Sequence, residues 1–305
     1  MNEDAADLRR AQWQMHLCVL LWGFTAILGK LISLTALALV WWRMLLVSLA
    51  LLAVPRVWRG LRALPPRLAA AFAGIGVLVA LHWLTFYGAI KLANASVAVS
   101  CIALAPVFLA IVEPLVAGRP FDPRELLLGA LVVPGVALVV GGVPTGMHLG
   151  IAVGVASALL VAVFGAYNKR LVRRADPLTV TFLGLCVGAI FLGLVTLLPG
   201  MPGTATFALP GARDALLLLL LALACTLFPF VLSLVALRHL SAFQAQLAVN
   251  LEPVYAIMLA VLLLGEQREL GLAFYAGVAI ILLAVFAHPW LTRSRPTRPV
   301  PTPPA

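Results

Sequence analysis

Ten apolar runs, each long enough to cross a lipid bilayer, constrain this chain more than any other feature of its sequence. A transmembrane helix needs about 20 mostly apolar residues, because the hydrocarbon core is about 30 Å thick. The runs cover residues 14–33, 36–54, 68–89, 95–117, 124–141, 149–169, 178–197, 215–237, 241–264 and 270–288. Only 10% of the residues are charged, against about 25% in soluble domains. The sequence therefore predicts an all-α polytopic membrane protein with ten transmembrane helices.

Positive charge predicts how these helices are oriented. If all ten runs span the membrane, 16 of the 21 Lys and Arg residues lie on the side of the N-terminus, four lie on the other side, and Arg43 lies inside a run. Lys and Arg concentrate in cytoplasmic loops, so both termini are expected in the cytoplasm. The net charge of +10 is thus explained by short loops between apolar runs, and we expect no nucleic-acid partner.

The second half of the chain repeats the first at a shift of 147 residues. Pro106 and Val107 fall on Pro253 and Val254, and Gly118 falls on Gly265. Each half holds five runs, so the second half enters the membrane from the opposite face. The sequence therefore predicts two inverted five-helix repeats, a common plan in secondary transporters. The predicted segments are a cytoplasmic N-terminus (1–13), the repeats (14–141 and 149–288) and a disordered cytoplasmic tail (289–305).

Four segments carry a family pattern: "LWGFTAILGK", "WWRMLL", "FYGAIKLANASVAVSCIALAPVFLAIVEPL" and "LVALRHLSAFQAQLAVNLEPVYAIMLAVLLLGEQ". Together with the ten runs, they resemble the EamA family of the drug/metabolite transporter superfamily over nearly the whole chain. This resemblance implies a permease of a bacterial-type inner membrane that carries small metabolites, often amino acids and often outward. Small multidrug exporters of the superfamily place a Glu in their first helix, but the first and sixth runs here have none, which disfavours a drug-cation exporter.

Glu252 is the main candidate for a functional site. It lies about eleven residues into the ninth run, or roughly 16 Å deep at 1.5 Å per residue. An ionised side chain at that depth costs about 2.5–3.5 kcal/mol, so the carboxyl group must be protonated, paired or facing water. It is therefore either a proton-coupling or substrate-amine site, or a structural partner.

Pro106 and Pro253 should interrupt two helices that are related by the repeat. Proline removes a backbone donor and clashes with the preceding turn, so these positions predict a site built from broken helices, or else simple kinks. Gln246 and Asn250 share a helix face and are further candidates. On a continuous helix, Glu252 points about 200° away from Asn250, so one face is expected to meet substrate and the other to pack.

Six more residues inside the runs are candidate substrate contacts: Trp22, Arg43, His82, Trp83, Phe86 and Tyr167. Arg43 either binds a substrate carboxylate, extends towards the membrane surface or pairs with Glu252. His82 either titrates near neutral pH or is a hydrogen-bonded packing residue. The aromatic residues either line a cavity or belong to the interfacial belt. Glu266, after the ninth run, is expected to be structural.

These features favour a secondary transporter, an exporter of small metabolites such as amino acids, that works by alternating access. An uncoupled facilitator or channel is the alternative. A membrane-embedded enzyme is disfavoured because the sequence has no HExxH metal motif and no serine nucleophile motif. The four cysteines lack metal spacing, and we expect no metal and no cofactor. The expected partners are a small-molecule substrate, lipid and, if transport is coupled, protons, with the chain as a monomer or homodimer.

Overall fold

The computed structural model is a helical bundle with no strand among the residues it describes, which are 2–201, 203–249, 251–268 and 270–292. For residues 2–5, 128, 242–243, 246–247 and 284–292 it describes the backbone only. The α-helices of the first half are α1 (Asn2–Leu31), α2 (Ala36–Leu52), α3 (Pro55–Ala63), α4 (Pro66–Leu92), α5 (Ala95–Ile102), α6 (Ala105–Ala117), α7 (Pro123–Ala130) and α8 (Val133–Gly141). Those of the second half are α9 (His148–Leu171), α10 (Pro177–Val195), α11 (Ala212–Ala222), α12 (Phe228–Ala236), α13 (Ala242–Val249), α14 (Glu252–Leu259) and α15 (Leu272–Thr292). Short 3₁₀ turns are η1 (Thr145–Met147), η2 (Gly203–Phe207) and η5 (Glu266–Arg268), and π turns are η3 (Leu223–Leu227) and η4 (Ala260–Leu264).

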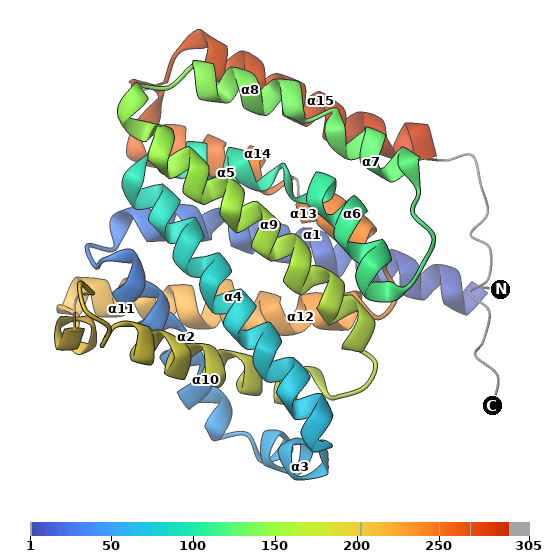
Figure 1. Ribbon diagram of the computed structural model, residues 1–305, viewed down its shortest axis with the longest axis vertical. Helices are drawn as coiled ribbons and strands as arrows, with labels where there is room; N and C mark the ends of the chain where they lie inside the picture. The colour runs from blue at the N-terminus through green and yellow to red at the C-terminus, as the bar shows by residue number, and fades with distance from the viewer. Residues whose placement is uncertain (1, 202, 250, 269, 293–305) are drawn as a thin grey trace.

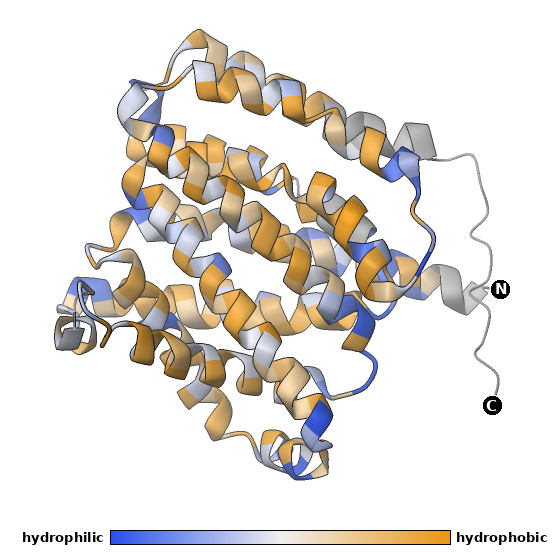
Figure 2. Cartoon of the chain, viewed as in Figure 1, coloured by the Kyte–Doolittle hydropathy of each residue, from blue (hydrophilic) through white to orange (hydrophobic). Residues whose placement is uncertain are grey.

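Six helical segments of the described chain are long and apolar enough to cross a membrane. They are Ala6–Leu31, Pro66–Leu92, Ala95–Ala117, Thr145–Leu171, Pro177–Val195 and Ala212–Ala236. The pair α2 and α3 would make a seventh, bent by 93°. The expected spans 124–141, 241–264 and 270–288 are not among them, because the first two are divided into shorter helices and the third is short over its fully described part. Figure 2 shows apolar residues along the whole length of the helices, with hydrophilic residues gathered near the helix ends.

The helices pack in pairs around a central group (Figure 1). In that group α4 packs on α9 and α10, α1 packs on α12 and α14, and α6 packs on α9. Helices α8 and α15 form an outer pair at the top of Figure 1. They approach closely at Gly135 and Gly277, where an added Cβ would lie within 2.6 Å and 2.4 Å of the partner's carbonyl oxygen. Small residues of this kind let helix backbones come together in a membrane.

Hydrogen bonds between helix ends define the two ends of the bundle. At the end where α1 begins, Arg173 donates to the Arg238 carbonyl and Arg170 donates to the Val116 carbonyl. We call this the basic end. At the other end, which we call the distal end, Lys91 Nζ donates to the Ile32 carbonyl at 2.5 Å.

Two broken helices lie antiparallel in the centre. Helix α5 stops at Ile102, and α6 starts at Ala105 with Pro106 in its first turn. Helix α13 stops at Val249, and α14 starts with Glu252 and Pro253. Proline is well suited to a first turn because the N–H it lacks would have no intrahelical partner there. Helix α5 packs on α14 and α6 packs on α13, so each broken helix begins where the other ends.

The repeat is also visible in how these broken helices are capped. The Asn94 side chain accepts a hydrogen bond from the Val97 N–H at 2.9 Å, and Ser241 Oγ, 147 residues later, accepts one from the Gln244 N–H at 2.9 Å. Such caps satisfy donors that have no intrahelical acceptor. The helices end at Gly118 and Gly265, with φ of 66° and 69°. Glycine adopts this left-handed conformation without strain.

The predicted terminal segments are only partly described. Helix α1 begins at Asn2, so most of the predicted N-terminal segment is helical. Residues 289–292 of the predicted tail belong to α15, and residues 293–305 lie outside the described part of the chain.

Candidate functional site

A cavity of about 140 Å³ lies between the broken helices and α1, α4, α9 and α12. A single water needs only about 10–15 Å³ by the same measure, so the space can hold a small solute. Its aromatic lining residues are Trp22, His82, Trp83, Phe86, Phe164 and Phe230. Its polar lining residues are Thr25, Arg43, Asn168, Ser233 and Glu252. The cavity therefore combines aromatic walls with one acidic and one basic group.

Glu252 reaches the cavity from the first turn of α14. Its side chain is 8% exposed and forms no hydrogen bond or ion pair with another described residue. The N-terminus of a helix favours a negative charge because the first N–H groups point away from the helix body. Its counterpart in the first repeat is Ala105, so an acid occupies this position in the second repeat and not in the first.

Arg43 is held by neutral groups from other helices. It is 3% exposed, its Nε donates to Thr226 Oγ1 at 2.6 Å, and its Nη1 donates to Tyr87 Oη at 2.8 Å. Its guanidinium carbon lies 3.8 Å from the centre of the Trp83 ring. No ion pair within 4.0 Å joins it to Glu252 in the described structure. Arg43 therefore neither extends to the surface nor pairs directly with Glu252.

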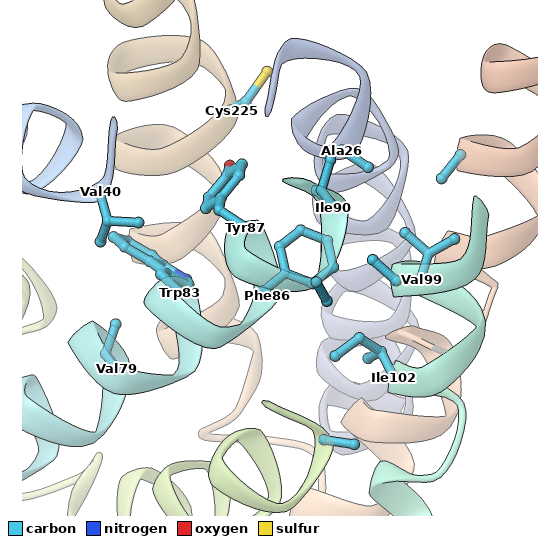
Figure 3. Close-up of a cluster of buried hydrophobic side chains, with 14 of the residues drawn as sticks. Ala26, Val40, Val79, Trp83, Phe86, Tyr87, Ile90, Val99, Ile102 and Cys225 are labelled. Carbon is cyan, nitrogen blue, oxygen red and sulfur yellow. The ribbon is translucent and has the colours of Figure 1, made fainter. Parts of the chain in front are cut away.

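Figure 3 shows how α4 presents its aromatic residues, with Tyr87 on the side of Cys225 and Trp83 near Val40. Thr226, next to Cys225, lies in the π turn η3, and its hydroxyl donates to the Leu221 carbonyl at 2.5 Å. A π turn inside an α-helix is rare and often marks a functional site. Here it aims a hydroxyl at the Arg43 side chain.

His82 is oriented by Ser157 on α9. Nδ1 lies 3.0 Å from the Ser157 carbonyl oxygen and 2.8 Å from Ser157 Oγ. A carbonyl oxygen only accepts, so Nδ1 carries a proton, and in the neutral ring Nε2 is then an acceptor. The ring also lies against Phe164, with centroids 5.4 Å apart. His82 is thus a fixed part of the cavity wall.

The structure brings together six of the residues predicted from sequence, namely Trp22, Arg43, His82, Trp83, Phe86 and Glu252. Pro106 and Pro253 are buried in the first turns after the breaks. Tyr167 is 38% exposed and is not among the described lining residues. Asn250 and the side chain of Gln246 lie outside the described residues, and the break before Glu252 removes the continuous helix on which their relative orientation was predicted.

Sequence reasoning missed Thr25, Thr226, Phe230 and Ser233 as members of the site. For Thr25, Thr226 and Ser233 the signal available was a polar residue within an apolar run, and for Phe230 there was none. Threonine and serine are common inside membrane helices, where they bond to the backbone one turn back. Their presence alone therefore does not distinguish them from packing residues. In the described part of the chain, no group of three His, Cys, Asp or Glu side chains could hold a metal ion.

A bundle of apolar helices around an internal cavity that holds an acidic and a basic side chain defines a multi-pass membrane protein. The chain belongs to the EamA-like transporter family, whose model matches residues 10–141 and 148–287. The expected family is therefore confirmed in both halves of the chain. A solved structure titled "Crystal structure of protein" has a TM-score of 0.65 at 18% sequence identity, covers 93% of this chain and 98% of that chain, and supports the fold alone. No curated protein matches the chain.

Proposed function

We propose that the protein is a secondary transporter that exports small metabolites such as amino acids by alternating access. The proposed arrangement is ten spans in two inverted repeats, in a bacterial-type inner membrane with both termini in the cytoplasm. It is supported by the matched breaks and caps at a spacing of 147 residues. The excess of arginine at the basic end supports the orientation.

The observation that carries this proposal is an acidic side chain that forms no hydrogen bond or ion pair with another described residue and lies in a cavity between broken helices. Ionising a buried carboxyl group is costly unless a cation or a proton compensates for it. Glu252 is therefore proposed as the group that exchanges protons or binds a substrate amine during transport. Because α14 begins at this residue, movement of the broken helix also changes the surroundings of the carboxyl group.

The two charged groups of the cavity suggest the kind of substrate. Arg43 is bound by hydroxyl groups and an indole face, so its positive charge is not neutralised by contact. Glu252 is likewise unpaired in the described structure. A zwitterion can place its carboxylate near Arg43 and its ammonium near Glu252, while the aromatic walls accept an apolar side chain. This arrangement favours amino acids over simple cations.

The test is counterflow in proteoliposomes loaded with single amino acids and related metabolites, with and without a pH gradient. We expect wild type to show saturable counterflow and gradient-driven accumulation. Glu252→Gln should lose accumulation, because the amide cannot exchange a proton, and should keep counterflow with a raised KM, because the neutral amide attracts the substrate ammonium less strongly. Asp7→Asn, which removes an exposed acid of α1, is the matched control and should retain both.

Other outcomes would contradict the proposal. Solute movement without counterflow would identify a channel. Accumulation that persists in Glu252→Gln would exclude this residue as the coupling group. A wild-type protein that moves none of a broad panel of metabolites in either direction would overturn the transport function itself.

A further inference from the structure

At the distal end, one carboxylate joins the ends of the two broken helices. Glu266 Oε1 accepts a hydrogen bond from the Ala95 N–H at 3.0 Å. Its Oε2 accepts from the Ser96 N–H at 3.0 Å and from Ser96 Oγ at 2.6 Å. Glu266 is 2% exposed, and both of its partners are fully buried. A carboxylate at a helix N-terminus binds orphan N–H groups and is favoured by the helix dipole.

This contact lies beyond the described lining of the cavity, on the distal side. Ala95 starts α5, which leads to the first break, and Glu266 follows Gly265, which ends the helix that starts at Glu252. The described lining residues extend from Glu252 in the middle of the bundle to Leu237 and Ala245 near the basic end. None lies beside Glu266. The cavity therefore extends towards the basic end, and its described lining does not include Glu266, Ala95 or Ser96.

The repeat shows what is missing at the basic end. Under the shift of 147 residues, the position of Glu266 corresponds to Arg119, and Ala95 corresponds to Ala242. An arginine has no acceptor, so it cannot bind the N–H groups that start α13. Arg119 instead pairs with Glu113 at 3.4 Å and with Glu125 at 2.5 Å.

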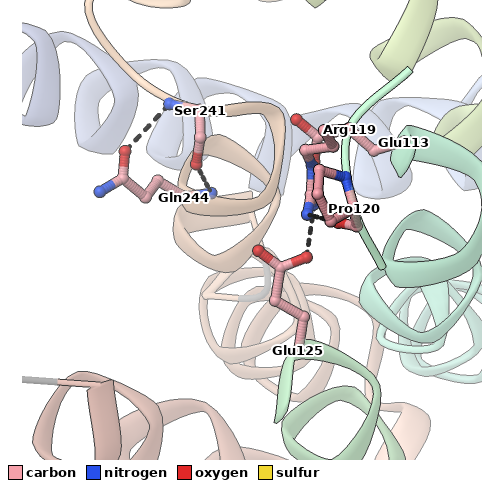
Figure 4. Close-up of polar contacts among 6 residues, drawn as sticks. All are labelled: Glu113, Arg119, Pro120, Glu125, Ser241 and Gln244. Atoms are coloured by element: carbon pink, nitrogen blue, oxygen red, sulfur yellow. Dashed lines mark hydrogen bonds and ion pairs between the residues drawn. The ribbon is translucent and has the colours of Figure 1, made fainter. Parts of the chain in front are cut away.

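Figure 4 shows that Ser241 and Gln244 bond only to each other among the residues drawn, beside the Arg119 cluster but not joined to it. The start of α13 is therefore capped locally, by its own helix. The carboxylate bridge between the two broken helices is present at the distal end, whereas at the basic end the position equivalent to Glu266 holds Arg119, which pairs with other described side chains.

We propose that Glu266 is a positioning residue of the transport cycle, which holds the distal end closed and must release the start of α5 before the cavity can open there. Inverted repeats exchange their packing when a transporter changes its open side. A contact that is formed at one end only stabilises one of the two states and shifts their populations. The bridge thus makes the state with a sealed distal end the resting state. The mechanism rests on the proposed transport function, but the seal itself can be measured without transport.

The experiment uses native Cys225, a residue of η3, as a reporter. Cys225 is 4% exposed and lies beside Tyr87, which belongs to α4 (Figure 3). Cys18, Cys101 and Cys186 are replaced by alanine, and a membrane-impermeant thiol reagent is added from the distal side. In wild type, Cys225 should react slowly. In Glu266→Ala and Glu266→Gln its labelling rate should rise about fivefold or more, a typical size for conformational coupling.

Two controls separate opening of the seal from unfolding. Glu125→Gln removes an acid at the basic end and should leave the labelling of Cys225 from the distal side unchanged. A second reporter, Ser233→Cys, lines the cavity towards the basic end, and Glu266→Ala should make its labelling from the basic side slower. An unchanged Cys225 rate in monodisperse Glu266→Ala, or faster labelling of both cysteines, would overturn the proposal.

Counterflow on the same preparations distinguishes failure of this inference from failure of the proposed function. If Cys225 becomes accessible but wild type carries no metabolite, the seal stands and the transport function fails. If wild type shows counterflow and Glu266→Ala changes neither labelling nor rate, transport stands and the assignment of Glu266 fails.

Discussion

At the residue scale, Arg43 shows how a guanidinium is held inside an apolar bundle without an ion pair to any described acidic residue. Its hydrogen bonds to Thr226 and Tyr87 and its position over the Trp83 ring replace part of its lost hydration. An indole face attracts a cation through its quadrupole. Since none of these groups is negative, they orient the charge without neutralising it.

This network predicts a difference between two substitutions of one residue. Thr226→Val removes the acceptor of the Arg43 Nε and should destabilise the protein by about 1–3 kcal/mol, the cost of an unsatisfied buried donor. It should also raise the KM for counterflow, because Arg43 loses its fixed orientation. Thr226→Ser keeps the hydroxyl and should stay close to wild type in both thermal stability in detergent and KM. Equal values for the two variants would show that the hydroxyl does not position Arg43.

At the element scale, glycine decides how closely α4 and α10 approach. A Cβ added at Gly76 would lie 2.2 Å from the Gly184 carbonyl oxygen, whereas one added at Gly74 would meet nothing within 4 Å. Both residues are in the interior of α4, so they share the same intrinsic helix propensity. The difference between them therefore isolates helix packing.

Gly76→Ala should destabilise the protein by several kcal/mol, because the clash is with backbone and cannot be relieved by a change of rotamer. Gly74→Ala should be neutral or stabilising by up to about 1 kcal/mol, since alanine is the better helix former. Thermal unfolding of both variants in detergent, followed by loss of the monodisperse fraction, provides the comparison. If Gly74→Ala were less stable than Gly76→Ala, this result would contradict the packing of α4 on α10.

Sequence patterns predicted some elements well and others poorly. The positions of Pro106 and Pro253 indicated interrupted helices, because proline acts on its own turn. The interruption between α7 and α8 has the same signal, since Pro134 lies in the first turn of α8, but residues 124–141 were interpreted as one continuous apolar run. The capping of α5 by Glu266 depends on a residue 171 positions away, which local patterns do not reveal.

At the scale of the whole molecule, the proposed orientation places the basic end in the cytoplasm. Ala63, at the end of α3, and Thr204, in the turn between α10 and α11, are both exposed and lie at opposite ends of the bundle. In a cysteine-free background, Ala63→Cys should react with an impermeant thiol reagent only after the membrane is permeabilised. Thr204→Cys should react in intact cells. The opposite pattern would invert the topology, and labelling of both in intact cells would contradict the number of spans between them.

The sequence by itself determined that the chain is a membrane protein with a repeated half, and it indicated Glu252 as a candidate site. These conclusions depend on the length of apolar runs, on spacing along the chain and on the cost of a buried charge, all of which can be judged without knowing how the helices pack. The tertiary structure alone decided which side chains share the cavity, that Thr226 and Tyr87 rather than Glu252 bind Arg43, and that Glu266 closes the distal end. Those contacts join residues from different helices. The sequence pattern of one helix does not specify which other helix packs against it, or at which position along the helix axis the two come into contact.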